Sequence, residues 1–183
     1  MLNLIIHNQS EDQKKAVDVI ASENIRILEE AKAGETCYAD SQGWIDTEEW
    51  AGEENIKRLE EIAKEIRENA DAFVLIGVGG SNNAARSVIE ALKKDDAPEI
   101  IYAGNTLSPD AMNRMMKRLE GKSIYIDCIA KNFETLEPGS SFRILRKYME
   151  KTYGTEAGKR IIATGTVGSS LEELCTKYGY TFL

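Results

Sequence analysis

The sequence has little of what marks secreted, zinc-binding or membrane-spanning chains. Its three cysteines, Cys37, Cys128 and Cys175, are far apart and form no CxxC pair. This usage fits a reducing compartment and argues against a disulfide framework or a zinc site. The N-terminal apolar run, Leu2 to Ile6, is too short for a secretory signal, and no stretch is long enough to cross a bilayer. We therefore expect a cytoplasmic protein.

The sequence is also poor in positive charge and in histidine. Lysine and arginine number 23 against 31 aspartates and glutamates, which gives a formal net charge of −8. An acidic chain without a basic cluster is a poor candidate for binding nucleic acid or an anionic membrane. The single histidine, His7, lies near the N-terminus, where we expect a surface or packing residue rather than a catalyst. We expect neither a metal nor an organic cofactor.

What the chain does contain is a regular alternation of short apolar runs and amphipathic stretches. We expect strands at roughly 20- to 35-residue intervals, each linked by a helix, which predicts an α/β fold with a parallel sheet and right-handed crossovers. The fold class is a five-stranded, doubly wound parallel sheet in a three-layer sandwich, preceded by a helical segment. The five expected strands begin at Phe73, Ile100, Ser123, Arg160 and Tyr180.

The N-terminal segment is expected to form a separate part of this architecture. Ser10-Glu11-Asp12-Gln13 has the form of a capping box, and it starts a helix that Gly34 ends. Residues 36–52 are irregular and contain Trp44 and Trp50, which we expect to pack this segment onto the core, with a ligand or interface role as the alternative. We therefore divide the chain into residues 1–52, packing on the core, and residues 53–183, the α/β domain.

Several patterns predict how the helices of the α/β domain begin. Ser108-Pro109 supplies an N-cap followed by a proline at the first helical position. Pro138 is expected to open another helix, and Ser169-Ser170-Leu171-Glu172 forms a second capping-box pattern.

Other patterns predict which helical side chains face the core. Glu53 to Asn69 has the apolar spacing of a strongly amphipathic helix. In the helix that ends near Leu92 we expect Val88, Ile89 and Leu92 to face inward. We expect three methionines to fill gaps in the core rather than to form a binding surface: Met112, Met115 and Met116.

The stretch that organises the domain is Gly77-Val78-Gly79-Gly80-Ser81-Asn82, between a buried strand and a helix. Such a turn exposes backbone N–H groups at the positive end of a helix dipole, where an anion can bind. Asn82 replaces the third glycine of a dinucleotide fingerprint, and no acidic residue follows the next strand. No GK[ST] phosphate loop is present. From the spacing alone, a ligand-binding loop and a plain strand-to-helix turn remain equally supported.

The loop after the third strand, residues 130–138, combines a cation, hydrogen-bonding side chains and a helix start. These features suit a phosphate group. Glu134 opposes them, because a carboxylate about 4 Å from a phosphate oxygen costs on the order of 4 kcal/mol per charge pair at a near-surface dielectric. Either Glu134 points away or phosphate binding is weakened here.

These motifs together resemble the N-terminal sugar isomerase (SIS) domain of the glucose-6-phosphate isomerase family. The resemblance rests on GxGGS before an alanine-rich helix, a strand ending in Ala103-Gly104-Asn105 and a lysine loop ending in Glu137-Pro138. Gly43-Trp44 upstream and Phe142-Arg143 downstream also fit, so it covers about residues 43–183. In that family the GGS segment contacts the sugar, which implies this role for Gly79, Gly80 and Ser81.

The phosphate-binding pattern of the family matches less completely. Lys131, Thr135 and Glu137 occupy matching positions, and Asn132 replaces a hydroxyl residue while keeping a hydrogen-bond donor. Ala130 and Glu134 depart from the pattern by removing two hydroxyl groups and adding a negative charge. The implied ligand site comprises Gly79, Gly80, Ser81, Lys131, Asn132 and Thr135. Glu137 is a possible acid–base group, and its alternative role is to satisfy backbone groups or Lys131.

The resemblance also implies what the chain lacks. The family's base glutamate, its ring-opening histidine, a further lysine and an arginine lie in a second SIS domain and a C-terminal tail, beyond Leu183. Isomerisation needs both a base and a ring-opening acid. We therefore favour binding of a sugar or sugar phosphate without full isomerase activity. The alternatives are an active phosphosugar isomerase completed by a partner chain and a degenerate domain that serves association. In each case we expect a homodimer.

Overall fold

The computed structural model describes residues 7, 10–34, 43, 47–131 and 133–183. The chain divides into two compact units, Met1–Leu59 and Glu60–Leu183, which follow one another along the sequence. The packing of residues 1–52 onto the core stays a prediction.

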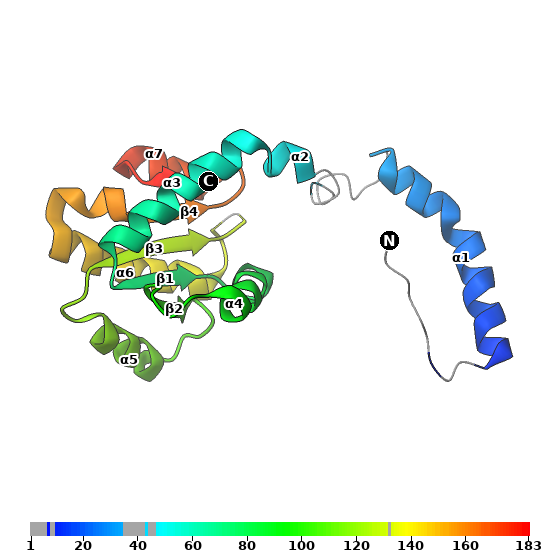
Figure 1. Ribbon diagram of the computed structural model, residues 1–183, viewed down its shortest axis with the longest axis horizontal. Coiled ribbons are helices and arrows are strands. Elements are labelled where there is room, and N and C mark those ends of the chain that lie inside the picture. The colour runs from blue at the N-terminus through cyan, green and yellow to red at the C-terminus, as the bar shows by residue number, and fades with distance from the viewer. Residues whose placement is uncertain (1–6, 8–9, 35–42, 44–46, 132) are drawn as a thin grey trace. The chain divides into compact units, whose positions relative to one another are not determined.

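The N-terminal unit contains α1 (Glu11–Lys32) and α2 (Thr47–Trp50) (Figure 1). The predicted capping box begins α1: Ser10 Oγ accepts a hydrogen bond from the Gln13 N–H, and Gln13 Oε1 accepts one from the Ser10 N–H. Each bond satisfies an N–H that the first helical turn leaves unpaired. No residue of α1 is buried. Trp44 and the side chain of Trp50 lie outside the described residues.

The α/β unit is built on the predicted five-stranded parallel sheet. The strands lie in the order β2-β1-β3-β4-β5, and every neighbouring pair is parallel. At the carboxyl end of β1, which lies between β2 and β3, Ile76 is opposite Ala103 on one side and Cys128 on the other. The strands are β1 (Ala72–Ile76), β2 (Glu99–Ala103), β3 (Ile124–Ile129), β4 (Ile161–Thr164) and β5 (Thr181–Phe182).

Helices cover both faces of the sheet and complete the three layers. α3 (Glu53–Asn69) and α4 (Gly80–Leu92) lie on the face that carries Phe73 and Ile100. The opposite face packs against α5 (Pro109–Leu119), α6 (Leu136–Tyr153) and α7 (Ser170–Tyr178), and a 3-10 helix, Gly154–Arg160, leads into β4. This arrangement follows from right-handed crossovers that run in opposite directions from the middle of the sheet.

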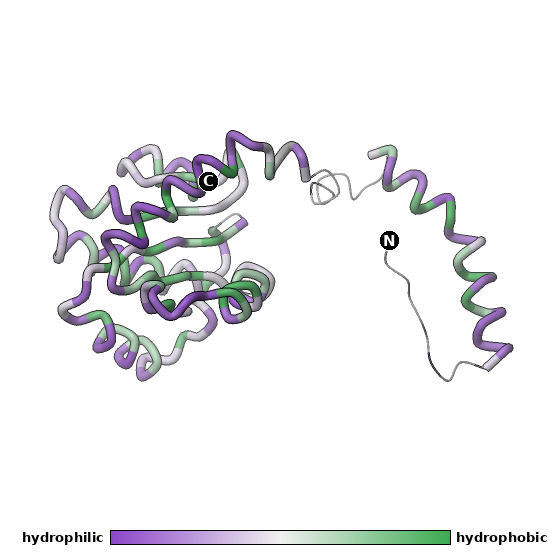
Figure 2. Tube along the Cα trace, in the orientation of Figure 1, coloured by the Kyte–Doolittle hydropathy of each residue, from purple (hydrophilic) through white to green (hydrophobic). Residues whose placement is uncertain are grey.

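The buried core lies between the sheet and α5–α7. The strand side chains on this face alternate along each strand, as the pleat requires, and include Val74, Ile76 and Ile126, all fully buried. Phe142, Leu145 and Met149 of α6 pack against them. Hydropathy follows the same division, with the strands predominantly apolar (Figure 2). Of the three methionines predicted to fill the core, Met115 is buried, and Met112 and Met116 are packed against the core while partly exposed.

The opposite helical layer buries much less apolar surface, and one prediction about it is wrong. Val88 and Leu92 of α4 are 58% and 73% exposed, although both were expected to face inward. They are four residues apart and therefore share one stripe of α4, whereas Ile89 is half-buried. All three side chains line an open groove that also contains Phe73 and Ile100 of the sheet, so this layer leaves apolar surface uncovered.

The helix starts agree with the sequence patterns with two adjustments. α6 begins at Leu136 after the N-cap Thr135, two residues before Pro138, because proline is tolerated anywhere in a first turn whose N–H groups are unpaired. Ser169 caps α7 as predicted, but the carboxylate of Glu172 accepts a hydrogen bond from the Gly168 N–H instead of the Ser169 N–H. Only one arm of the capping box is therefore present.

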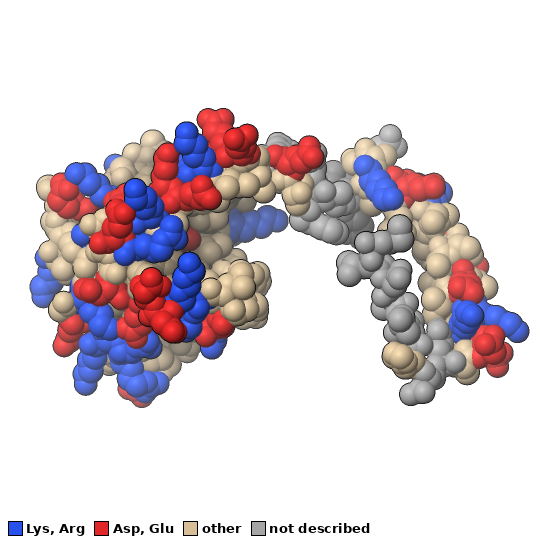
Figure 3. Space-filling view, viewed as in Figure 1, with Lys and Arg blue, Asp and Glu red and all other residues tan. Residues whose placement is uncertain are grey.

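Charges of both signs are interspersed over the visible face of the α/β unit (Figure 3). In the part of the chain that the structure describes, no helix combines the length and apolar character needed to cross a membrane.

Candidate functional site

The candidate site lies where the direction of the chain reverses in the sheet. From β1 the chain moves outward to β2, and it then returns across β1 to β3 and continues to β4. The loops after β1 and β3 therefore leave neighbouring strands at the same carboxyl edge, in the position where ligands bind in doubly wound folds. Because Ile76 pairs with Cys128, the glycine loop and Ala130-Lys131 follow directly from strands that lie side by side.

Gly77 allows the first turn of α4 to pack closely over the end of β1. A Cβ atom at Gly77 would lie 3.0 Å from the carbonyl oxygen of Ser81. The Gly77 N–H donates a hydrogen bond to Ala103 O at 3.0 Å, which extends the β1–β2 pairing by one residue. This glycine therefore serves the packing of the chain itself.

Gly79 and Gly80 differ from Gly77, because nothing in the described chain lies within 4 Å of a Cβ atom built at either position. Gly79 is the N-cap of α4 with φ of 58°, a left-handed conformation that favours glycine. Gly80 has no such conformational requirement, and both residues are exposed. Neither packing nor backbone geometry explains a glycine at position 80.

The start of α4 has no side-chain cap. The Gly79 carbonyl accepts hydrogen bonds from the N–H groups of Asn82 and Asn83, at 3.2 and 2.9 Å. The preceding N–H groups, on Gly80 and the half-buried Ser81, belong to the helical turn whose N–H groups have no intrahelical acceptor. These donors lie beside the open space above the two glycines, so the turn can hydrogen-bond to oxygen atoms of an incoming ligand.

Asn82 is a polar residue of this turn that the sequence analysis did not assign to the site. It is 2% exposed, and its Nδ2 has no hydrogen-bond partner among the described groups. A buried amide without an acceptor costs roughly 1–3 kcal/mol, so its retention requires an explanation. The signal was present in the sequence, because an asparagine stands where a dinucleotide fingerprint has a glycine.

The loop after β3 is held in place by backbone hydrogen bonds to the loop after β4. The Ala130 N–H donates to Thr164 O at 3.0 Å, and the Thr166 N–H donates to Lys131 O at 3.2 Å. Gly165 permits this contact, since a Cβ atom there would lie 2.7 Å from Ala130 O. The backbone that carries Lys131 is therefore fixed by the neighbouring strand.

The predicted side chains of this loop lie around the start of α6. Lys131 and Thr135 are exposed, and Thr135 is the N-cap of α6 without a side-chain hydrogen bond to the helix. Glu137 is half-buried in the first helical turn, while Glu134 is exposed. Asn132 lies outside the described residues. The structure thus places Lys131, Thr135 and Glu137 in one short segment.

A second cation, which the sequence analysis did not assign to the site, lies near this segment. The guanidinium of Arg143, in the second turn of α6, is 5.7 Å from the centre of the Phe133 ring. Its Nη1 atom is 3.4 Å from the position that a Cβ atom at Gly139 would occupy. Phe133 itself has φ of 62°, and its ring packs edge-on against Phe142 at 5.5 Å. Arg143 therefore adds positive charge beside the turn that follows Lys131.

Asp127 is an acidic residue in the otherwise apolar strand β3. The Thr164 hydroxyl donates a hydrogen bond to its carboxylate at 3.3 Å. Burial raises the pKa of the Asp127 carboxyl to about 6, and the Thr164 hydrogen bond lowers it only in part. A single charged residue within an apolar strand is a signal that is visible in the sequence. His7, which was expected to be a surface or packing residue, is exposed.

Comparison with known proteins gives a consistent set of sequence relatives, although no family model matches the chain. A glucose-6-phosphate isomerase of Symbiobacterium thermophilum is 35% identical over 151 residues, which are 76% of this chain and 34% of that enzyme. The Clostridium perfringens (strain 13 / Type A) enzyme of the same name is 34% identical over 189 residues, covering 92% of this chain and 42% of the enzyme. The chain therefore spans well under half the length of these relatives.

Solved structures support the same fold. The crystal structure of a hypothetical protein from Thermus thermophilus aligns with a TM-score of 0.71 at 20% identity, covering 91% of this chain and 40% of that one. A glucose-6-phosphate isomerase from Chlamydia trachomatis aligns with a TM-score of 0.59 at 21% identity, covering 68% of this chain and 24% of that one. At such identities the likeness concerns the fold alone.

Proposed function

The chain belongs to the glucose-6-phosphate isomerase family over a part of the length of those enzymes, and on this premise we propose that it binds a hexose phosphate at the carboxyl edge of its sheet without completing the isomerase reaction alone. The sugar would lie over the glycine loop, against Gly79, Gly80 and Ser81. The phosphate would lie toward Lys131, Asn132 and Thr135.

The observation that carries this proposal is the open space at Gly80. A glycine in the first turn of a helix lowers helix stability relative to alanine. At Gly80 no contact within the described part of the chain requires this cost, since a Cβ atom would meet nothing there within 4 Å. The close approach of a ligand to the backbone would explain why position 80 is a glycine. In the same turn, the buried amide of Asn82 has no acceptor among the described groups, which leaves one further donor of this turn unsatisfied.

Charge at the phosphate end is balanced between opposing groups. Lys131 and Arg143 attract an anion, and Glu134 repels it. All three side chains are exposed, so solvent reduces each contribution below the value for a buried pair. We therefore expect binding that is weak for a charged sugar and sensitive to salt.

Two charge changes test this proposal in opposite directions. In isothermal titration calorimetry with glucose 6-phosphate, Lys131→Gln is expected to weaken binding about tenfold, as for loss of one charge-assisted hydrogen bond. Glu134→Gln is expected to strengthen it. Lys147→Gln is the matched control, because this exposed lysine of α6 has the same charge but lies further along the helix. Absence of a heat signal in the wild type at millimolar ligand, or equal effects of Lys131→Gln and Lys147→Gln, would contradict the proposal.

Turnover would require groups beyond those assembled here. Glu137 is the acid–base candidate of this site, and it lies half-buried in the first turn of α6. A coupled isomerase assay on the purified chain separates binding from catalysis. Background-level rates with several sugar phosphates would support binding alone, whereas turnover that Glu137→Gln abolishes would favour an isomerase completed by a second chain.

Association is the second candidate function, and one surface favours it. An apolar groove of about 410 Å³ lies between α3 and α4, with Val88 and Leu92 exposed at its rim. Exposed apolar patches of this kind mark interaction surfaces. We propose that the chain forms a homodimer and that it resides in the cytoplasm, where its buried free thiols Cys128 and Cys175 stay reduced. Sedimentation as a monomer at high concentration would exclude the dimer.

A further inference from the structure

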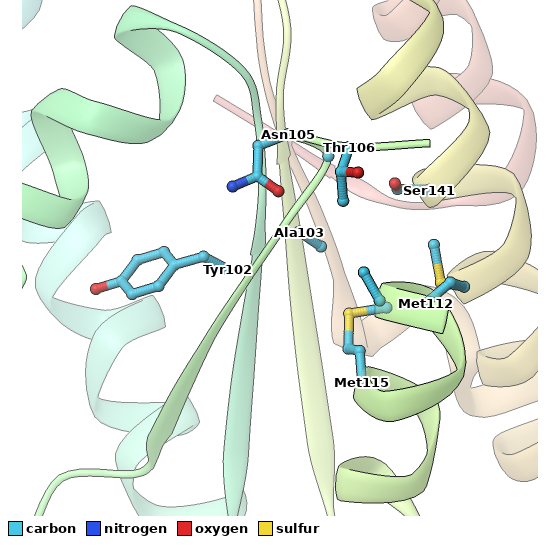
Figure 4. Close-up of a pocket in the computed structure, with 9 residues that line it drawn as sticks. Tyr102, Ala103, Asn105, Thr106, Met112, Met115 and Ser141 are labelled. Carbon is cyan, nitrogen blue, oxygen red and sulfur yellow. The ribbon is translucent and has the colours of Figure 1, made fainter. Parts of the chain in front are cut away.

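A groove that the proposed hexose-phosphate site does not use lies one strand away, between the β2–α5 loop and α6. Two cavities, of about 80 and about 350 Å³, share Thr106, Met112 and Ser141 in their walls and are therefore adjacent parts of this groove. It lies beside the glycine loop, because a Cβ atom at Gly104 in its wall would lie 2.9 Å from Gly77 N. Figure 4 shows its inner part.

Among the described residues, none that lines this groove is Asp, Glu, Lys or Arg, although these residues form 30% of the chain. Hydroxyl and amide side chains are frequent instead: Asn105, Thr106, Ser108, Asn113, Ser140 and Ser141. An anion placed here would have no cation to compensate for its lost hydration. The groove therefore disfavours a phosphate and suits an uncharged, hydrogen-bonding group.

The polar and apolar parts of the lining are separated in space. The hydroxyl groups of Thr106 and Ser141 lie toward one another, above the side chains of Met112 and Met115 (Figure 4). Ser141 is only 2% exposed, and it contributes to the walls of both cavities. The Tyr102 ring points away from the groove, toward the face where Arg86 lies 4.9 Å from its centre.

We propose that this groove binds the uncharged ring of a small saccharide or polyol. Sugar hydroxyls both donate and accept hydrogen bonds, as serine and threonine hydroxyls do. The C–H faces of a sugar ring match the thioethers of Met112, Met115 and Met116, which are soft and adaptable. The volume is at the lower end of the range for small-molecule sites, roughly 300–1,000 Å³, and therefore fits about one ring. This site is distinct from the glycine loop and does not depend on the proposed function.

Methyl NMR of the 183-residue chain tests the proposal, because the methionines report on the groove directly. With ¹³C-methyl methionine, added glucose is expected to shift the Met112 and Met116 signals saturably, with millimolar affinity. The Met149 signal is the internal control, since this side chain is fully buried in the core and lies outside the groove. Ser141→Ala is expected to weaken the response about threefold to tenfold by removing one hydrogen bond. Ser87→Ala on α4 should leave it unchanged.

Several outcomes would overturn the proposal: no shift of Met112 and Met116, a shift that grows linearly without saturation, or equal responses of wild type and Ser141→Ala. Binding at the glycine loop is read separately, from the backbone amides of Gly79 to Ser81 during titration with glucose 6-phosphate. Gly80→Ala should weaken the amide response to glucose 6-phosphate and preserve the methyl response to glucose. The failure of one site is thereby distinguished from the failure of the other.

Discussion

Replacement of Gly80 by alanine is expected to stabilise the chain while it weakens ligand binding. A Cβ atom at this position meets nothing within 4 Å, and the residue does not adopt a positive φ. Alanine should therefore raise the free energy of unfolding by up to about 1 kcal/mol, through higher helix propensity and a less flexible unfolded chain. For a chain of this size the gain corresponds to a rise in Tm of about 2–4 °C.

Binding should change in the opposite direction, because the methyl group fills the space from which a ligand reaches the N–H groups of Gly80 and Ser81. Loss of one or two neutral hydrogen bonds weakens affinity by about tenfold. Differential scanning fluorimetry measures the first effect, and calorimetry with glucose 6-phosphate measures the second. A stability effect alone, without loss of affinity, would show that the glycine does not face a ligand.

The sign of the stability change is itself a test. A fall in Tm for Gly80→Ala would mean that the turn needs glycine for its own conformation, which refutes the open-space argument. Ser87→Ala is the matched variant on the same helix. It removes the hydrogen bond from the Ser87 hydroxyl to Asn83 O and adds no atom at the carboxyl edge. It should leave affinity for glucose 6-phosphate unchanged.

Two further substitutions test the supporting framework. Gly165→Ala places a Cβ atom 2.7 Å from Ala130 O, so it should lower the free energy of unfolding by about 1–3 kcal/mol in a denaturant titration, and an unchanged midpoint would contradict the close approach. Burial raises the pKa of the Asp127 carboxyl from 3.8 to about 6, so the folded chain holds a proton that the unfolded chain has released, and stability falls as the pH rises between these two values. Asp127→Asn stays neutral, so its free energy of unfolding should not fall with pH in this range, and above pH 6 it should exceed that of the wild type by up to about 3 kcal/mol. Identical pH profiles of the two proteins would refute the raised pKa of Asp127.

The sheet and most helix starts were predictable because each depends on local signals. Apolar runs separated by amphipathic stretches identify the strands of a parallel sheet, and Ser10 and Ser108 cap helices through side chains that act on neighbouring residues. The exposure of Val88 and Leu92 was not predictable in this way. Helical periodicity shows that a stripe is apolar, but it does not show whether a neighbouring element covers that stripe.

In the candidate site, too, some features were predictable from local sequence and others depend on packing. The sequence led to the glycine loop and to the Lys131–Glu137 segment because both follow buried strands, and strand order in doubly wound sheets brings such loops to one edge. It did not lead to Arg143, because the placement of this guanidinium beside Gly139 and Phe133 depends on how α6 packs. It also did not reveal that Asn82 is buried without an acceptor, which only the packed turn shows.

The two halves of the proposed site respond differently to sequence change. The glycine loop presents backbone N–H groups, so its hydrogen-bonding capacity survives any substitution that leaves the turn open. The β3–α6 loop depends on side chains, so Ala130 and Glu134 alter it directly, while the backbone hydrogen bonds from Ala130 and Thr166 keep its path. In the proposed site, a ligand's neutral ring would therefore be held by the part that is hardest to lose, and its phosphate by the part that is easiest to lose. On this reasoning the ratio of affinities for glucose 6-phosphate and glucose, both read from the backbone amides of Gly79 to Ser81, measures how far the phosphate end has diverged. Glu134→Gln should raise that ratio, because it acts on the charged group alone and leaves the ring unaffected.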